Sequence, residues 1–499
     1  MSSNTLVLNT LREFRKELSR PFWLERESGK PDVVAILDEF SIQSFSNYLN
    51  LWLIEPTRFE LDLDRIKPSF LFVESAWNGN DGAWKYMVTS NSGPKEPLIN
   101  LVTACRERGI PTVFWNKEDP PHFSDFVSTA KLFDVIFTSD AEMIPRYKEH
   151  APNANVQLLQ FAASPRLHKP GPQRLYEMKD VAFAGQYFAH KFPERRQQMD
   201  ALFPAARKYG FDIFSRVLGG DERYQFPPEY AKNVVGSLPY LEMVEAYRDY
   251  KVFLNVNSVV DSNTMCARRV FELSACKTAV FGMESAAIRS VYDDTEMVLA
   301  EGSGEIAEKL RSLISDDDFR EQVSLRAWRK TLSWHTYEHR VNKILASIGI
   351  ESEPRNYLIV MNSDGLEESF IDEFIQSQNF DGPHNFRLVV DREVLDFSDV
   401  HAVFELSLNA HFKYDSFYTY DLVLAAEQQD SILVAKASEQ ESQERYVKNR
   451  PQYGWLMRYS VNENPGTRIF ESPTETALSD SEVYLSDTQG VTPVAGKSK

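Results

Sequence analysis

The chain has 499 residues, enough for three domains of ordinary size, and 42% of its residues are hydrophobic, as in other globular proteins. The formal net charge of -18 argues against a general nucleic-acid-binding protein, because the binding domain of such a protein is usually basic. No run of about 18 apolar residues occurs, so no membrane-spanning helix is expected, although peripheral membrane association stays open. The three cysteines suggest neither a disulfide framework nor a metal site, and no signal-peptide pattern is apparent, so we expect a cytoplasmic protein.

The chain begins with a helical segment, residues 1–30, in which apolar residues recur at helical spacing between residues 4 and 19. From residue 33 short apolar strands alternate with helical segments. This alternation predicts a parallel, doubly wound sheet in a Rossmann-like domain at residues 31–168. The expected strands are 33–37, 70–73, 112–115, 135–138 and 156–161.

Polar residues follow three of these strands, where the carboxyl ends of the strands would form one wall of a cleft. Glu74 ends the second expected strand, and the loop after it contains Trp77, Asn78 and Asn80. An indole ring can stack on a sugar, and carboxylate and amide groups can bind its hydroxyls, so we expect these four residues on the acceptor side. The alternative is a turn-rich loop whose tryptophans cover the sheet.

Glu118, Asp119 and His122 follow the strand expected at 112–115. Histidine titrates near neutral pH, so His122 is a candidate general base, and Glu118 and Asp119 are alternative bases. Each has a structural alternative: the histidine could be hydrogen-bonded within the loop, and the carboxylates could hold Lys117 and the loop in place.

A proline-rich segment at residues 165–172 marks a domain boundary. The alternation then starts again and predicts a second Rossmann-like domain at 173–350. Gly185 directly follows its first strand, where a glycine permits close approach of a ligand to the backbone, and Lys191 lies at the basic start of the next helix. The expected strands are 181–184, 211–214, 234–235, 253–256, 278–281 and 297–299.

The second domain is organised around residues 253–281, which predict a strand, a polar loop, a helix at 265–275 and another strand. Asn257, near the end of the first of these strands, is a candidate donor-binding residue. Such a loop, which leaves a parallel strand and opens a helix, is where open α/β sheets bind ligands. Arg268 and Arg269 lie in the first turn of the helix, whose N-terminus also attracts anions. Glu272 is their neighbour on the helix surface. Arginines for a diphosphate and Glu272 for a ribose would hold a nucleotide-sugar; the alternative is an ordinary surface ion pair.

Several motifs resemble the C-terminal domain of the CgeB-like glycosyltransferases, relatives of glycosyltransferase families 1 and 4. The resemblance continues into the first domain and covers about residues 30–348. The matching segments are Leu-Pro-Tyr at 238–240, Ala-Tyr-Arg at 246–248, Phe-Leu-Asn-Val-Asn at 253–257, Arg-Val-Phe-Glu at 269–272, His-Thr-Tyr-Glu-His-Arg at 335–340, and upstream 73–80, 116–120 and 183–185.

This resemblance implies the GT-B fold, in which two Rossmann-like domains face each other and a late helix crosses back to the first domain. It implies transfer of a sugar from a nucleotide-sugar to a saccharide or other glycoconjugate, in the synthesis of surface polysaccharides or glycans. Metal or another cofactor is not expected to be required, because positive side chains can stabilise the leaving diphosphate. The resemblance also implies that Gly185 and Lys191 lie against the donor diphosphate.

Two positions depart from the family pattern. Lys277 stands where a glycine usually follows the helix, and Thr264 stands where many retaining relatives have the first of two glutamates. These departures favour, as one alternative, a noncatalytic sugar-binding or assembly protein on the same fold. A second alternative is a transferase for polyol phosphates.

A third region, residues 355–470, has the pattern of a smaller α/β domain, for which we expect an accessory or acceptor-binding role. Residues 471–499 are rich in serine, threonine and glutamate and predict a flexible tail. The expected elements of the third region are strands at 358–361, 386–390, 402–406 and 432–434 and a helix at 366–376.

Overall fold

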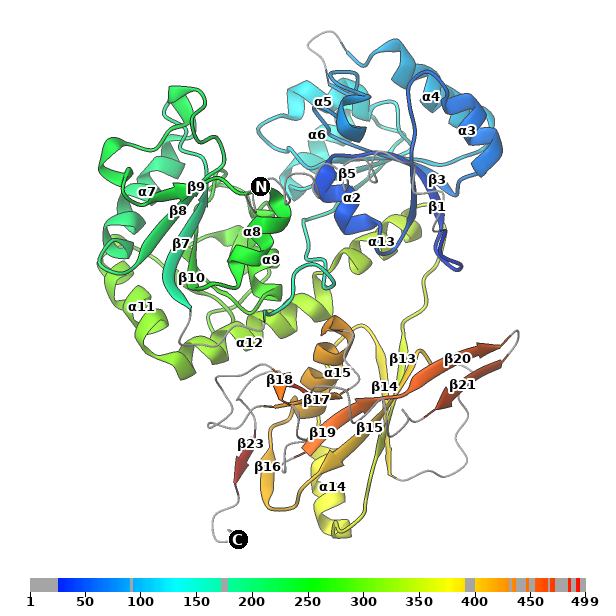
Figure 1. Cartoon of the computed structure of the whole chain (residues 1–499). Coiled ribbons are helices and arrows are strands. Elements are labelled where there is room, and N and C mark those ends of the chain that lie inside the picture. Colours follow the sequence, from blue (N-terminus) through cyan, green and yellow to red (C-terminus); the bar gives the residue numbers. More distant parts are fainter. Residues whose placement is uncertain are drawn as a thin grey trace, which may run out of the picture.

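The structure is a computed structural model in which the chain forms three domains. Figure 1 shows the first domain beside the second, with the third below them. The helix expected at residues 4–19 and most of the expected tail lie outside the described residues. The described residues are 26–89, 93–171, 178–390, 400–429, 433–436, 446–447, 454–464, 467–471, 483–485 and 491–493.

The first domain contains a sheet of six parallel strands in the order β2-β1-β3-β4-β5-β6. All five expected strands are present, and β2 is an additional strand at the edge of the sheet. The strands are β1 (Asp32–Ile36), β2 (Asn50–Leu53), β3 (Phe70–Glu74), β4 (Thr112–Asn116), β5 (Val135–Thr138) and β6 (Asn155–Leu158).

Helices cover both faces of this sheet, because alternate strand residues contribute to two separate apolar clusters. Helix α2 (Glu39–Phe45) lies on one face, while the other four helices of the domain lie on the opposite face. Those four helices are α3 (Phe59–Ile66), α4 (Glu96–Glu107), α5 (Phe123–Ala130) and α6 (Ile144–His150).

The second domain also contains six parallel strands, in the order β12-β11-β10-β7-β8-β9, which is the order of the Rossmann fold. The expectation of two Rossmann-like domains is therefore confirmed. The strands are β7 (Lys179–Gly185), β8 (Phe211–Ser215), β9 (Val234–Gly236), β10 (Tyr250–Asn255), β11 (Ala279–Met283) and β12 (Val298–Ala300).

Helices again cover both faces of the sheet. Helix α7 (Pro193–Ala206) and helix α11 (Ser303–Ser315) pack on one face, and α8 (Tyr240–Tyr247) and α9 (Arg268–Ala275) pack on the other. The helix expected at 265–275 begins only at Arg268. The hydroxyl of Ser262 accepts hydrogen bonds from two backbone N–H groups just before it, which holds the preceding segment in a turn.

Two helices connect the second domain to the rest of the molecule. Helix α12 (Asp317–Trp334) packs against α9, and α13 (Tyr337–Ser347) crosses back to the first domain. The guanidinium of Arg340 on α13 donates to the carbonyls of Gln160 and Phe161, both at 2.8 Å. This crossing is the feature that the GT-B fold implied. No helix in the described residues is long and apolar enough to cross a membrane.

The third domain contains a mixed seven-stranded sheet in the order β14-β13-β15-β19-β17-β22-β18. Two helices, α14 (Glu368–Ser377) and α15 (Tyr418–Gln429), contribute apolar residues to its core. The strands are β13 (Asn356–Met361), β14 (Asn385–Val390), β15 (Ala402–Leu408), β17 (Leu433–Ala435), β18 (Tyr446–Val447), β19 (Gly454–Arg458) and β22 (Val483–Leu485).

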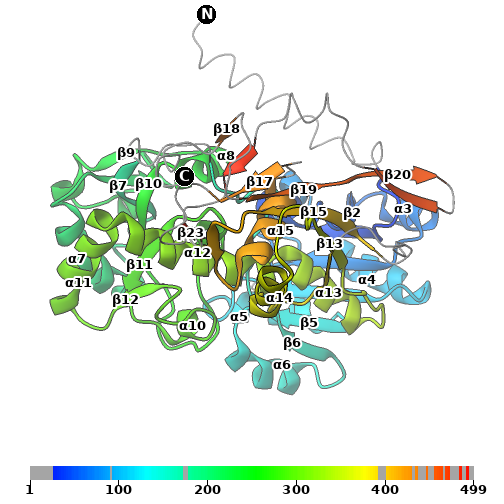
Figure 2. The same ribbon diagram turned by 90° about the horizontal axis from the view of Figure 1, so that it is seen from below.

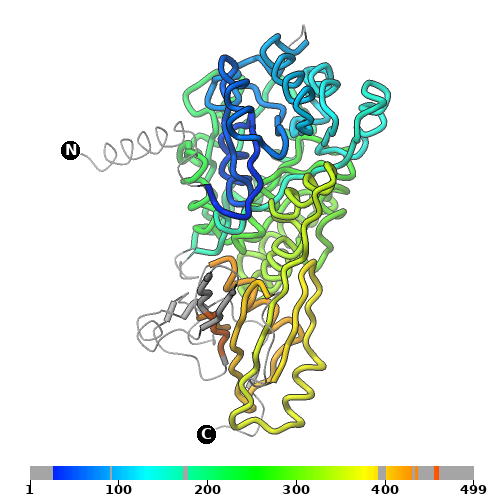
Figure 3. Tube along the Cα trace, turned by 90° about the vertical axis from the view of Figure 1, so that its right-hand side faces the viewer, coloured from blue at the N-terminus to red at the C-terminus, as the bar shows by residue number. Residues whose placement is uncertain are grey.

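The third domain is packed against the other two rather than held by a tether. One apolar cluster contains residues of all three domains, including Trp115, Trp328 and Tyr420. The view from below shows α15 beside α12, and Figure 3 shows the third domain at one end of the molecule (Figures 2 and 3). We therefore expect the third domain to contribute to the stability of the second.

Candidate functional site

A cavity of about 830 Å³ lies between the first and second domains. The first domain contributes most of the lining, and the second contributes two arginines and a tyrosine. The lining residues are Asp38, Glu39, Phe40, Ile42, Gln43, Leu53, Ile54, Glu55, Arg58, Asp62, Trp77, Asn78, Asn80, Asp81, Ala83, Lys117, Glu118 and Phe161 of the first domain with Arg216, Tyr240 and Arg268 of the second.

The topology of each sheet explains why polar residues gather at this cavity. In the first sheet β1 and β3 are neighbours, but the chain leaves them toward opposite faces, into α2 and α4. In the second sheet the same holds for β7 and β10, which lead into α7 and α9. Ligands of open α/β sheets bind at such points, outside the carboxyl ends of the strands.

A buried lysine organises the first-domain side of the cavity. The ammonium of Lys117 lies 2.9 Å from Glu74 and 2.8 Å from Asp38, whose other carboxylate oxygen accepts the N–H of Gly79. Burial would lower the pKa of Lys117, but the charges of Glu74 and Asp38 hold it above its ordinary value. Lys117 is therefore charged, and Glu74, which is fully buried, serves as its partner.

The loop after β3 presents its three expected acceptor residues in different ways. Trp77 and the exposed Asn78 line the cavity, where the ring and the amide can meet a ligand. Asn80 also borders the cavity, but its amide is bound to the protein: Nδ2 donates to the carbonyls of Ala35 and Ile54, and Oδ1 accepts the N–H of Leu37. Asn80 thus fixes the loop to the ends of β1 and β2.

The three candidate bases are not brought together. Glu118 is half-buried and lines the cavity. His122 does not line it; its ring packs edge-on against Trp77 at 5.3 Å, and its Nδ1 lies 2.7 Å from Asp125. Asp119 is fully buried and accepts hydrogen bonds from three side chains of its own domain. Those three donors are Asn116 at 2.8 Å, Thr138 at 2.6 Å and Tyr147 at 2.9 Å.

The guanidinium of Arg195 lies beside the end of β7. A Cβ on Gly185 would lie 2.9 Å from this guanidinium and 2.9 Å from the ring of Phe183, so a larger residue there would displace one of these side chains. Arg195 is almost fully buried and donates to the carbonyl of Val256 at 2.8 Å. Burial lowers the pKa of Arg195 to about 10, and the neighbouring charge of Arg269 adds to this effect.

Arg269 and Arg216 extend this cationic edge. Arg269 donates to the carbonyl of Ala184 at 2.6 Å and to the hydroxyl of Tyr247 at 3.3 Å. Arg216 directly follows β8 and lines the cavity, although the sequence reasoning did not select it. Within the described part of the chain, Arg195, Arg216 and Arg269 form no ion pair with a carboxylate. Such a group of unneutralised cations suits an anionic ligand.

Arg268 lies at the boundary of the two domains. Its guanidinium stands 4.5 Å from the ring of Phe40 in the first domain and 4.5 Å from the ring of Tyr240 in the second. It lies 3.3 Å from Glu272 and lines the cavity. The side chain is thus held between two aromatic rings, one on each side of the cleft.

Glu272 is buried beneath this arginine, with 2% of its side chain exposed. Its two carboxylate oxygens accept hydrogen bonds from Tyr240 at 2.8 Å and Tyr247 at 3.0 Å. Burial opposes its ionisation, but the charge of Arg268 and the hydrogen bond from Tyr240 hold the pKa of Glu272 below its ordinary value. The geometry favours an internal anion that orients Arg268, while the ribose contact stays a prediction.

The remaining donor-side candidates lie around this edge. Asn257 is buried at the end of β10, where its backbone N–H donates to Gln198 on α7 at 3.0 Å. Lys191 does not line the cavity, and its ammonium lies about 5 Å from the rings of Phe188 and Phe192. Arg195, four residues further on, takes the place beside Gly185 that the resemblance implied for Lys191.

Thr264 and Lys277, which depart from the pattern of the resembling family, each make specific contacts in the structure. The hydroxyl of Thr264 accepts the N–H of Ala141, and its carbonyl accepts the amide of Gln160, so Thr264 joins the loop to the first domain. Lys277 has a φ of 55°, the left-handed conformation that usually favours glycine at the end of a helix. Its ammonium lies 4.3 Å from the ring of Trp328.

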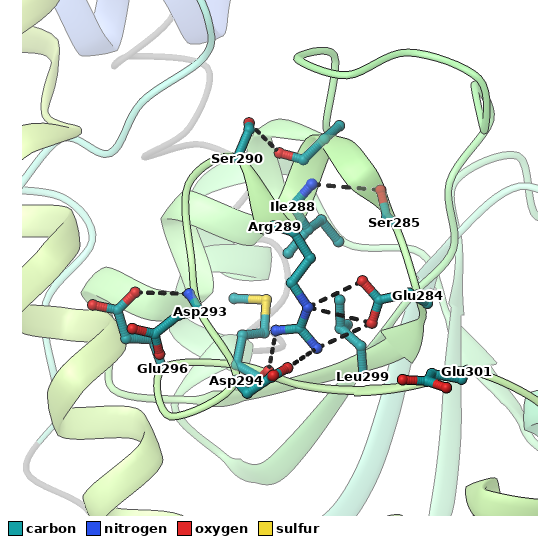
Figure 4. A network of polar contacts seen from close by, with 12 residues as sticks. Glu284, Ser285, Ile288, Arg289, Ser290, Asp293, Asp294, Glu296, Leu299 and Glu301 are labelled. Atoms are coloured by element: carbon teal, nitrogen blue, oxygen red, sulfur yellow. Dashed lines mark hydrogen bonds and ion pairs between the residues drawn. The ribbon is translucent and has the colours of Figure 1, made fainter.

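Another arginine of the second domain has a contrasting environment (Figure 4). Arg289 closes helix α10 (Ala286–Arg289), and its guanidinium contacts both carboxylate oxygens of Glu284. It also lies 2.7 Å from Asp294 and donates to the carbonyl of Met297. The charge of Arg289 is therefore neutralised within its own loop, unlike the charges of Arg195, Arg216 and Arg269.

A comparison with protein families finds a match to the second domain and the helices that follow it. Residues 195–346 match the family model described as Glycosyl transferase-like. A search of curated proteins finds no match. The match runs from α7 to α13 and includes the organising loop, helix α9 and every strand of the second sheet except β7.

Solved structures with a similar overall arrangement include three proteins. Anabaena Alr3699/HepE in complex with UDP-glucose has 10% identity and a TM-score of 0.44, over 63% of this chain and 91% of that one. Sucrose-phosphate synthase from Thermosynechococcus elongatus has 9% identity and a TM-score of 0.38, over 64% and 85%. TarM has 12% identity and a TM-score of 0.38, over 58% and 57%. At these values the likeness carries no information about individual residues.

Sequence reasoning selected neither Arg216 nor Arg195 as a site residue. Arg216 could have been found by the rule that selected Gly185, because it is the first residue after a parallel strand. Arg195 lies in the first turn of α7, ten residues after Gly185. Its proximity to Arg269 depends on β7 and β10 being neighbours, which the linear sequence does not reveal.

Proposed function

We propose that this chain is a glycosyltransferase of the CgeB-like type, which moves a sugar from a nucleotide-sugar to a saccharide or other glycoconjugate. The observation that carries the proposal is the group of cations at the carboxyl edge of the second sheet, near a cavity that separates two domains. Glycosyl transfer releases a nucleoside diphosphate, and fixed positive charges stabilise the charge that develops on it. Surface polysaccharide or glycan synthesis is the corresponding pathway class.

The donor would bind to the second domain. Arg216 and Arg268, which line the cavity, would meet the diphosphate together with the neighbouring Arg269, and Arg195 would support them from behind Gly185. These cations repel one another in the free protein, and the charges of Arg268 and Arg269, after desolvation, lower the pKa of Arg216. An anionic donor would relieve this repulsion, which adds to the free energy of binding.

The acceptor would bind against the first domain, between Trp77 and Glu118. Of the three candidate bases, Glu118 lines the cavity, so we assign it the removal of the acceptor proton. The first-domain lining carries six carboxylates and two cations, which favours a neutral or amine-bearing acceptor over one with phosphates. This charge disfavours the alternative of a polyol-phosphate transferase, whose growing acceptor chain is anionic.

The experiment is a panel of nucleoside diphosphates and nucleotide-sugars, first by thermal shift and then by product analysis. A ligand that binds only the folded state raises the unfolding temperature, so at least one nucleotide should stabilise the protein. Release of nucleoside diphosphate from a stabilising nucleotide-sugar would then support catalysis. Absence of stabilisation by every nucleotide would refute the donor site, while binding without hydrolysis or transfer would favour the noncatalytic alternative.

A further inference from the structure

A glutamine of the third domain reaches the helix that carries the donor-side arginines. Gln428, near the end of α15, is 3% exposed. It lies between the second domain, α12 and the segment that joins β6 to β7, which we call the linker. Its amide nitrogen donates to the carbonyls of Ala275 at 2.9 Å and His168 at 2.8 Å. Its amide oxygen accepts the indole N–H of Trp328 at 2.7 Å. Both amide hydrogens and the oxygen are therefore engaged.

The two carbonyls belong to segments that shape the cavity. Ala275 is the last residue of α9, whose first two residues are Arg268 and Arg269. The last carbonyls of a helix have no partner within the helix, so a buried donor is needed there. His168 belongs to the segment that joins the first domain to the second. Gln428 thus joins the end of α9 to this linker.

The linker continues the connection from His168 to Arg268. The ring Nδ1 of His168 accepts the N–H of Ser164 at 2.9 Å, so its proton lies on Nε2. Nε2 donates to the hydroxyl of Tyr240 at 2.9 Å, and this hydroxyl donates to Glu272 at 2.8 Å. Burial lowers the pKa of His168 to about 4, which keeps the ring neutral and this order of donors fixed. Glu272 in turn faces Arg268.

We propose that Gln428 is a positioning residue for the donor site, and that the third domain orients α9 and its arginines through it. The inference rests on the proposed function only for the ligand that the arginines bind. The orientation of α9 does not depend on the proposed function. Other contacts dock the third domain without reaching α9 or His168. Arg329 on α12 forms two bonds with Asp421, at 2.6 and 2.8 Å, and Ser333 bonds Tyr420. Removal of the Gln428 amide should therefore leave the domains docked.

The test compares Gln428→Met with Gln429→Met in the full-length chain. Methionine has a similar volume but no N–H, and Gln429 makes only a 3.3 Å bond to the carbonyl of Pro170. Amide hydrogen exchange at residues 268–278 should speed up about 10-fold in Gln428→Met and stay unchanged in Gln429→Met. Affinity for nucleoside diphosphate should fall about 10-fold, and affinity for the nucleoside without phosphates should change less.

A second variant guards against a failure to fold. Gln428→Leu also removes both amide N–H groups but adds no buried charge, so it should show the same pattern. The inference would be overturned if both variants showed normal exchange in α9 and normal affinity, or if only their unfolding temperature fell. In that case, nucleotide binding by the wild type would still leave the proposed function intact. Faster exchange in α9 in a protein whose wild type binds no nucleotide would support the positioning role and refute the proposed function.

Discussion

Replacing Arg269 by alanine separates ligand binding from stability. In the free protein Arg269 donates to the carbonyl of Ala184 and the hydroxyl of Tyr247, and its charge adds to that of Arg195. Arg289 is the matched control, because it lies in the same domain but is neutralised by Glu284 and Asp294.

The two substitutions should have opposite effects on ligand affinity and on stability. A charge-assisted hydrogen bond to phosphate contributes about 1.5–3 kcal/mol, so Arg269→Ala should weaken nucleoside diphosphate binding by roughly 10- to 150-fold. Its effect on unfolding should stay within about 1 kcal/mol, because the lost hydrogen bonds are offset by relief of repulsion with Arg195. Arg289→Ala should lower stability by about 1 kcal/mol, since its ion pairs are solvated, and leave affinity unchanged.

Calorimetric titration with nucleoside, monophosphate and diphosphate at two salt concentrations provides the assay. The loss in Arg269→Ala should grow with the number of phosphates and shrink at high salt, because salt screens the attraction. Equal losses in the two variants would show that general destabilisation explains the result. Unchanged affinity of Arg269→Ala for all three ligands would refute the assignment of the donor site.

Three further predictions concern the first domain and the domain boundary. Glu118→Gln should lower turnover about 100-fold with donor affinity nearly unchanged, and His122→Ala should have a smaller effect; the reverse order in kinetic assays would make His122 the base. Burial raises the pKa of Asp119 from 3.8 to about 7, so the folded protein holds this proton more tightly and stability falls as pH rises between those values. Asp119→Asn should remove up to about 1.4 kcal/mol per pH unit of this slope in urea unfolding from pH 4.5 to 7, and an unchanged slope would contradict the assignment. A chain that ends at Ile350 should lose stability, because it exposes the face of α12 that Tyr420 covers; an unchanged unfolding temperature would show that the first two domains fold alone.

The fold was predictable because buried parallel strands are continuous apolar runs between helices. Strand β2 was not predicted, because only Leu51 of its four residues is buried. This strand lies at the edge of the sheet. The start of α9 was placed three residues early, because the sequence does not show that Ser262 holds a turn before it.

The site was only partly predictable, because its residues meet through strand order rather than sequence spacing. Arg268, Arg269 and Glu272 were selected from one short segment with helical spacing. Arg216 comes from another strand, and its proximity to Arg268 follows from the packing of the sheet. The partners of Glu272 were also hidden, since His168 lies in a proline-rich linker that shows no sign of a buried hydrogen bond.

The left-handed lysine at the end of α9 has an evolutionary consequence. A non-glycine residue in this conformation costs about 1 kcal/mol, and Lys277 has the ring of Trp328 on α12 to pack against. Trp328 in turn donates to Gln428 of the third domain. In related sequences that lack the third domain, this packing would be exposed to water, so a glycine should return at the position of Lys277. Among related sequences, lysine at this site should therefore occur with the third domain and glycine without it.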